Sequence, residues 1–418
     1  MRAALVSLFA AVLLVATPAA RSTPDRPNDP AWPSEWGPAL TRAPEVWQRG
    51  TGSAAVVIAV VDTGVAPVAD LAGALVAGVD LLGGGVGQGG LAELGYHGTW
   101  VASIIAARGD NGRDAAGYCW ACSIMPVRVA DGSTPAEASR VARGITWAVD
   151  HGARIVNVSL AGEVPSADEE AAVAYAAAHD VLVVASAGNS GDDARHYPGA
   201  YASALAVAGT DEHDVLYPWA TRGAWVPLAA PGCATVVDPN VGAAYGCGSS
   251  FAPAAVSGIA GLLLSFNPDL TAAQIAAALR SSAHAVEGIG GGRVDAAAAF
   301  TALALHATNV PSPARFPLAP ATAAAPVEVS DLHGTLTGAR SLSFVTGRGR
   351  VAVRLAVRPP ARCALLLATG TAVVYASGEH GVVNLETSAA AGSKHLTISC
   401  APARAVNYSL ELERPVVP

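Results

Sequence analysis

Three segments of the sequence carry side chains suited to nucleophilic catalysis. Asp62 ends an apolar run in Asp-Thr-Gly, His97 lies in His-Gly-Thr, and Ser250 lies in Gly-Ser-Ser-Phe-Ala-Pro before an Ala/Leu-rich stretch. A serine becomes a nucleophile when a histidine accepts its proton, and a carboxylate can orient that histidine. Taken singly, the same residues are also typical of a strand end, a loop and a helix cap.

A fourth segment, Ala-Ser-Ala-Gly-Asn-Ser, places Asn189 after another apolar run. Such an asparagine is either a turn residue or a hydrogen-bond donor to a developing oxyanion. The serine segment is not the Gly-x-Ser-x-Gly elbow of α/β-hydrolases, because Ala252 replaces the second glycine. The order Asp, His, Ser also differs from the hydrolase order, which argues against an esterase of that type.

Together the four segments resemble those of the subtilisin-like serine proteases (subtilases), over residues 28–303. The resemblance implies a secreted endopeptidase that cleaves polypeptides through an acyl-enzyme and needs no cofactor for catalysis. It implies that the catalytic residues are Asp62, His97, Ser250 and Asn189. The alternative is a non-catalytic binding protein with the same fold, and the four intact residues argue against it.

The resemblance also implies a set of substrate-binding residues, and one of them is a histidine. His196 occupies the expected floor of the pocket for the P1 side chain, the residue whose carbonyl is attacked. An inward-facing histidine would make the floor polar, and positive below about pH 6.5, which should weaken the preference for large apolar P1 residues and admit polar or acidic ones. The alternative is a solvent-facing loop histidine. The expected substrate-binding residues are Ser159, Leu160, Ala161, Gly162, Ala187, Gly188 and His196.

A structural calcium site is a further expectation from the resemblance. Asp29, Asp70 and Asn111 match positions that share one Ca²⁺ in several subtilases. Oxygen ligands from distant segments suit this cation. The alternative is three ordinary polar surface residues.

Six cysteines suit an oxidising compartment. Sequence proximity favours the pairs Cys119–Cys122, Cys233–Cys247 and Cys363–Cys400 among the possible pairings. Cys119-Trp-Ala-Cys122 also matches a redox motif, but it precedes an apparent strand, which favours a structural link. As a zinc half-site it lacks a second close ligand pair.

The elements that must position these residues alternate between strands and helices. The predicted strands are nearly continuous apolar runs, as expected of strands buried on both faces. They cover Val56–Val61, Ile124–Val129, Arg154–Ser159, Val181–Ser186 and Ala204–Gly209. The predicted helices cover Thr99–Ala107, Pro135–His151, Ala167–His179, Ser250–Ser265 and Thr271–Ser282. This alternation predicts an α/β fold with a doubly wound parallel sheet.

The chain divides into four predicted parts. Arg2, an apolar run and small residues indicate a signal peptide over residues 1–20, with an uncleaved anchor as the alternative. The peptidase domain is expected over residues 21–305, followed by a Pro/Ala-rich linker over 306–328. Short strand-like runs in residues 329–418 predict a small all-β sandwich.

Composition narrows the class of protein. Apolar residues make up 52% of the chain and charged residues 14%, which excludes intrinsic disorder. The formal charge is −8 and no Lys/Arg-rich run occurs, so neither nucleic acid nor an anionic membrane is an expected partner. We expect a monomer that is extracellular or periplasmic and leaves the membrane once the signal peptide is cleaved.

Overall fold

The computed structural model describes residues 26–82, 85–86, 96–132 and 136–305, together with the backbone of strands between residues 327 and 415. The predicted signal peptide and the predicted linker up to residue 326 lie outside the described residues. Within the described part of the chain, no helix has the length and apolar character needed to cross a membrane.

One large sheet organises the first part of the chain. Its strand order is β11-β12-β8-β7-β6-β5-β1-β4-β2-β3. Neighbours from β12 to β2 pair in parallel, whereas the outer pairs β11–β12 and β2–β3 are antiparallel. The strands are β1 (Val57–Asp62), β2 (Val79–Asp80), β3 (Gly85–Val86), β4 (Ser123–Arg128), β5 (Ile155–Val158), β6 (Leu182–Ser186), β7 (Ala204–Thr210), β8 (Leu228–Pro231), β11 (His284–Ala285) and β12 (Gly292–Arg293).

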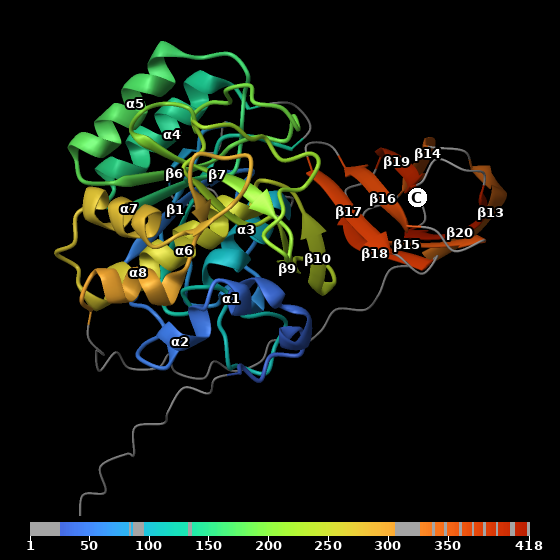
Figure 1. Cartoon of the computed structure of the whole chain (residues 1–418), viewed down its shortest axis with the longest axis horizontal. Helices are drawn as coiled ribbons and strands as arrows, with labels where there is room; N and C mark the ends of the chain where they lie inside the picture. Colours follow the sequence, from blue (N-terminus) through green and yellow to red (C-terminus); the bar gives the residue numbers. More distant parts are fainter. Residues whose placement is uncertain are drawn as a thin grey trace, which may run out of the picture.

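Helices cover both faces of this sheet, which confirms the predicted doubly wound α/β fold (Figure 1). The helices α3 and α6 pack in the larger core, and α4 and α5 pack in a second core on the other side. The helices are α1 (Trp36–Leu40), α2 (Ala43–Trp47), α3 (Tyr96–Ala106), α4 (Ala138–Asp150), α5 (Ala167–Ala178), α6 (Phe251–Phe266), α7 (Ala272–Ser281) and α8 (Ala296–Ala302), with single 3₁₀ turns at Trp32–Ser34 and Ala69–Leu71.

The central strands form where the sequence is densest in β-branched residues. β1, β5 and β6 are buried along almost their whole length, as parallel strands between two helical layers must be. All three carry polar residues just at or beyond their carboxyl ends. In an open parallel sheet this edge is where ligand-binding groups collect.

Sequence analysis did not predict the segment between β7 and α6. It forms β8 and the antiparallel pair β9 (Cys233–Asp238) and β10 (Gly242–Cys247). β8 and β10 are short and rich in alanine or glycine, with Pro231 at the end of β8, so they lack the β-branched pattern that marks the central strands, whereas β9 has only the short run Thr235–Val237. β8 is held by pairing with β7 and β12, which are distant in sequence, whereas β9 and β10 pair with each other as a hairpin.

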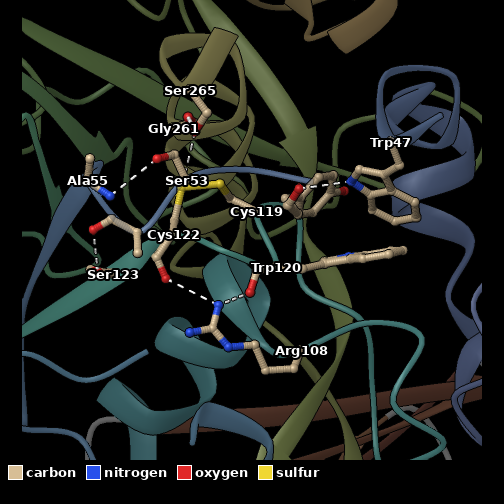
Figure 2. The surroundings of a disulfide bond; sticks show 12 residues. Trp47, Ser53, Ala55, Arg108, Cys119, Trp120, Cys122, Ser123, Gly261 and Ser265 are labelled. Carbon is tan, nitrogen blue, oxygen red and sulfur yellow. Dashed lines mark hydrogen bonds between the residues drawn. A yellow bond between two sulfur atoms is a disulfide. The ribbon is translucent and has the colours of Figure 1, made fainter. Parts of the chain in front are cut away.

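Two of the three predicted disulfides are present among the described residues, Cys119–Cys122 and Cys233–Cys247. Figure 2 shows the first, which lies between Trp47 and Ser265 and close to Arg108. Both of its cysteines are fully buried. Burial of both sulfur atoms suits a structural link, because exchange chemistry requires access to a sulfur.

The tail forms eight strands in two antiparallel sheets, ordered β13-β20-β15-β18 and β14-β19-β16-β17. That the two sheets make a sandwich domain stays a prediction. Cys363 of β16 and Cys400 of β19 are register partners, but their side chains lie outside the described residues, so the third disulfide stays a prediction too. The strands are β13 (Val327–Leu336), β14 (Ala339–Thr346), β15 (Gly349–Arg358), β16 (Arg362–Thr369), β17 (Ala372–Gly378), β18 (Val382–Ala389), β19 (Gly392–Ala401) and β20 (Val406–Pro415).

Candidate active site

The carboxylate of Asp62 and the imidazole of His97 face each other at the carboxyl edge of the sheet. Asp62 is the last residue of β1 and is fully buried, and His97 lies in the first turn of α3. His97 Nδ1 lies 2.8 Å from Asp62 Oδ1 and 2.9 Å from Oδ2. With Nδ1 protonated and donating to the carboxylate, Nε2 is left as the proton acceptor.

Gly98 allows this approach. A Cβ atom at Gly98 would lie 2.2 Å from the backbone oxygen of Gly64, which follows the Asp-Thr pair. Only glycine therefore lets the start of α3 lie against the end of β1. The hydroxyl of Thr63 reinforces the contact by accepting a 3.0 Å hydrogen bond from the Gly98 N–H.

Two opposing effects set the basicity of His97. Burial lowers the pKa of the ring, because a charged imidazolium loses its hydration, while the negative charge and hydrogen bond of Asp62 raise it. The net result is a pKa above the ordinary value of 6.5. His97 is thus a stronger base than a free histidine.

Ser250 is the residue that caps α6, and Asn189 follows β6. The side-chain oxygen of Asn189 accepts a 3.0 Å hydrogen bond from the backbone N–H of Ser249. This contact occupies the acceptor end of the amide and leaves its NH₂ group as the free donor. Gly188, just before Asn189, has φ +104, and a Cβ atom there would lie 2.6 Å from the His196 ring.

His97, Asn189 and Ser250 line one cleft of about 450 Å³. The segment after β5 forms one wall and is held to the opposite wall by paired backbone hydrogen bonds of 2.9 and 2.8 Å between Gly162 and Tyr197. The bond between Tyr197 and Pro198 is cis. Of the predicted substrate-binding residues, those that line the cleft are Ser159, Leu160, Ala161, Gly162, Gly188 and His196.

Ala187 and His196 are two of the predicted pocket residues, and both are buried. Ala187 is fully buried, and its side chain packs with Ala206, Ala208 and Val226, so its role in substrate binding stays a prediction. His196 is 5% exposed, and its Nε2 lies 3.1 Å from the hydroxyl of Ser190.

The three residues predicted to bind calcium lie in one cluster, in which Asp29 and Asp70 are buried and Asn111 is exposed. The side-chain nitrogen of Asn111 donates a 2.6 Å hydrogen bond to Asp70 Oδ1, and the backbone N–H of Asn111 donates to Asp29 Oδ1 at 3.2 Å. Burial raises the pKa of Asp29, and raises that of Asp70 to about 7. Glu35 is part of the same cluster, and burial raises its pKa to about 8.

This set of side chains supplies the oxygen ligands that a divalent cation prefers, but it does not form a complete metal site. No ion pair of the described residues includes Asp29, Asp70 or Glu35, although the charge of the buried Arg108 interacts with that of Asp70. Hard oxygen ligands of this kind suit Ca²⁺. Within the described part of the chain, however, no three His, Cys, Asp or Glu side chains are grouped as a metal would require.

Sequence analysis missed three polar residues at or beside the cleft. Glu169 lines the cleft, and Asn157 and Ser257 form a buried hydrogen-bonded pair behind its wall. Glu169 follows Ser166 by three residues at the start of a helix, a spacing that indicates only a helix cap. Asn157 lies inside an apolar strand and Ser257 inside an apolar helix, where single polar residues give no functional pattern.

Comparisons with known proteins agree with this geometry. The family model described as "Subtilase family" matches residues 53–310. Thermitase of Thermoactinomyces vulgaris is 40% identical over 268 residues, covering 63% of this chain and 94% of thermitase. Subtilisin Savinase of Lederbergia lenta is 34% identical over 272 residues, covering 63% of this chain and 97% of Savinase. Among solved structures, a protease from Pseudoalteromonas arctica superposes with a TM-score of 0.60 and 30% identity, covering 66% of this chain and 99% of that protein.

Proposed function

The chain belongs to the subtilase family and is a serine-type endopeptidase, and from this premise we propose that Asp62, His97 and Ser250 are its catalytic triad. The observation that carries the proposal is the double contact of His97 Nδ1 with the Asp62 carboxylate, at the mouth of the cleft that Ser250 also lines. A non-catalytic binding protein of the same fold is not favoured, because all four functional residues are intact.

In the proposed reaction, Ser250 Oγ attacks the carbonyl carbon of the scissile peptide, and its proton passes to His97 Nε2. The tetrahedral intermediate collapses, the C–N bond breaks, and the same proton passes from His97 to the leaving amine. Water then attacks the acyl-enzyme carbonyl carbon while its proton passes to His97 Nε2, the ester bond to Ser250 Oγ breaks, and His97 returns the proton to Ser250 Oγ as the acid product leaves. Asp62 orients the ring and stabilises the imidazolium in both steps.

Asn189 is the proposed donor to the oxyanion. The hydrogen bond from the Ser249 N–H holds the amide oxygen, so the NH₂ group is available to the cleft. The backbone N–H of Ser250 lies at the start of α6, where the helix end carries partial positive charge, and is the proposed second donor. Both donors stabilise charge that exists only in the transition state and intermediate.

We propose that the protein is exported, with residues 1–20 as the signal peptide and polypeptides as substrates. Two disulfides among the described residues support an oxidising compartment. The mature protein is proposed to be extracellular or periplasmic. Its proposed parts are a peptidase domain over residues 21–305 and a separate β domain over residues 329–418.

A structural calcium ion is proposed at Asp29, Asp70 and Asn111. Two buried carboxylates and an amide side chain meet there, and no ion pair of the described residues includes either carboxylate. Asn111 would have to present its oxygen, not its nitrogen, to the ion. The proposed ion supports the fold and takes no part in the reaction.

Labelling of the purified protein with a fluorophosphonate tests the triad. We expect covalent labelling and casein hydrolysis by the natural sequence, and loss of both in Ser250→Ala. A circular dichroism spectrum checks that the variant is folded. Undiminished hydrolysis by folded Ser250→Ala would contradict the assignment of the nucleophile.

A further inference from the structure

A buried acidic side chain that is distant in sequence from the catalytic residues lines the same cleft as they do. Glu169 belongs to the first turn of α5, lines the cleft, and is 4% exposed. It is nearly as buried as a core residue, although a glutamate in the first turn of a helix is normally at the surface.

The sequence Ser166-Ala-Asp-Glu169 is typical of a capping box, in which the glutamate accepts a hydrogen bond from the N–H of the capping serine. Only half of that motif forms here. The Ser166 hydroxyl accepts a 3.5 Å hydrogen bond from the Glu169 N–H, but the Ser166 N–H donates to the hydroxyl of Tyr201 at 2.8 Å. Tyr201 therefore occupies the donor that the glutamate would otherwise satisfy.

Helix α7 shows the same motif in its complete form, which makes the difference clear. There the Thr271 N–H donates to Gln274 Oε1 at 2.8 Å, and the Gln274 N–H donates back to the Thr271 hydroxyl at 3.1 Å. In α5 the carboxylate of Glu169 is released from capping and belongs to the lining of the cleft.

The charge of Glu169 has no positive partner in the described structure. Burial raises its pKa to about 7, and a hydrogen bond with Tyr201 lowers it in part. No ion pair of the described residues includes it. Among the described residues that line the cleft there is no lysine or arginine, and the other acidic residue is Glu163. A buried carboxylate without a counter-ion is costly, and a cation that enters the cleft reduces that cost.

The surroundings of Glu169 suit an amphipathic side chain with a cationic end. Leu160 and Val164, together with Tyr197 of the opposite wall, line the same cleft. Lysine and arginine bury their aliphatic stems against apolar surface while the charged group reaches a polar partner. An acidic substrate side chain would instead meet a carboxylate of the same sign.

We propose that Glu169 is a specificity-determining residue of the P1 pocket and selects substrates with lysine or arginine at P1. The proposal rests on the proposed function, because it assumes that polypeptides bind in this cleft. It reverses the direction expected from His196 alone, which favoured polar or acidic residues.

The other titratable groups around the cleft do not cancel this preference. His196 lines the cleft, but its Nε2 contacts the Ser190 hydroxyl, which in turn donates to Asp192. Glu163 adds negative charge, Tyr201 contributes a hydroxyl, and Glu170 on the same helix turn is exposed. His97 of the lining is paired with Asp62, and Tyr197 contributes a phenol group to the same lining. The preference for a cationic P1 residue is therefore expected to strengthen as pH rises through about 7, when Glu169 ionises.

The first test compares p-nitroanilide peptides that differ only at P1, with lysine against norleucine, which has a similar stem without the charge. At about pH 8.5 we expect kcat/KM to be about tenfold or more higher for lysine, the size typical of a desolvated charge pair. Glu169→Gln should reduce this ratio to within about twofold of unity, whereas the matched control Glu170→Gln should leave it unchanged. An unchanged ratio in Glu169→Gln, or a natural enzyme that prefers norleucine, would overturn the proposal.

The second test measures the binding of a cation in the pocket of variants that lack the nucleophile. Calorimetry measures the binding of benzamidinium, a small aromatic cation, to Ser250→Ala and to Ser250→Ala combined with Glu169→Gln. We expect the second substitution to weaken binding about tenfold or more. Absence of peptide cleavage and of fluorophosphonate labelling would contradict the proposed function, whereas equal benzamidinium binding by both variants would contradict the role of Glu169.

Discussion

The hydroxyl of Ser159 donates a 2.6 Å hydrogen bond to the backbone carbonyl oxygen of Ser250. This hydrogen bond is the last in a buried series of hydrogen bonds between polar side chains. Ser257 Oγ donates to Asn157 Oδ1 at 2.9 Å, and Asn157 Nδ2 donates to Ser159 Oγ at 2.9 Å. Both Asn157 and Ser257 are fully buried. This series of hydrogen bonds thus links the end of β5 to the start of α6, where the proposed nucleophile lies.

Replacement of Ser257 by alanine should affect both stability and rate. Asn157 would lose a buried hydrogen-bond partner, so we expect the free energy of unfolding in urea to fall by about 1–2 kcal/mol. The Ser159 hydroxyl would then be held less firmly against Ser250, and kcat should fall by up to about tenfold with little change in KM. Ser265→Ala on the same helix is the control, because its hydroxyl bonds only within α6 and to a disulfide sulfur. A stable Ser257→Ala enzyme with normal kcat would contradict a positioning role.

Replacement of Asn189 by alanine should lower kcat by about 10²–10³ with little change in KM, because the amide donor acts in the transition state. Asn189→Asp is an informative partner variant. It keeps an oxygen for the Ser249 N–H but replaces the donor with an acceptor, so it should be at least as slow as Asn189→Ala. A value of kcat near that of the natural enzyme in either variant would exclude Asn189 from the oxyanion site.

The acid limb of the pH–rate profile should lie above pH 6.5, because the folded protein raises the pKa of His97 above that value. Below its pKa the ring is protonated and cannot accept the serine proton, so kcat/KM falls as pH falls. A substrate with norleucine at P1 keeps the titration of Glu169 from contributing. Asp62→Asn should remove the upward shift and lower kcat by about 10⁴. An acid limb that Asp62→Asn leaves in place would contradict the pairing.

Removal of Ca²⁺ by a chelator should lower the thermal midpoint, and the loss should grow with pH. Burial raises the folded pKa of Asp70 to about 7 and of Glu35 to about 8, above their unfolded values. Without a cation, the native state therefore binds more protons than the unfolded state, and stability falls as pH rises through this window. A bound cation offsets that loss by stabilising the ionised carboxylates. Scanning calorimetry with and without chelator, at about pH 5.5 and 8.5, measures the difference.

The variant Asp70→Asn provides the control for chelation, since it removes one proposed ligand charge. Its thermal midpoint should respond less to the chelator than that of the natural protein. An identical midpoint with and without chelator at the higher pH, with no metal in the purified protein, would remove all three residues from the proposed site.

A chain that ends after Leu305 should retain peptidase activity on small substrates. Leu305 is buried in the core that contains α6, whereas the strands of the tail form sheets of their own. We expect kcat/KM for a p-nitroanilide peptide to stay within about twofold of the full-length value, as for a domain that folds independently. A shortened protein that folds but does not cleave this substrate would show that the tail belongs to the catalytic unit.

The parallel α/β fold can be predicted from the linear pattern of residues, and so can the residues that lie at the edge of the sheet. Buried parallel strands are recognisable as short β-branched runs, and Asp62 and Asn189 lie at or just beyond the ends of such runs. His97 and Ser250 open helices, which local glycine and serine signals also indicate. These features depend on a few neighbouring residues, so a linear pattern contains them.

The role proposed for Glu169 depends on contacts between segments that are distant in the sequence. Whether this carboxylate caps α5 or lines the cleft depends on Tyr201, which lies beyond two intervening segments of chain and takes the Ser166 N–H. The chain from Ser257 through Asn157 to Ser159 likewise joins a helix to a distant strand. The burial of a side chain and its choice of hydrogen-bond partner depend on how such distant segments pack. A local sequence pattern does not contain this information.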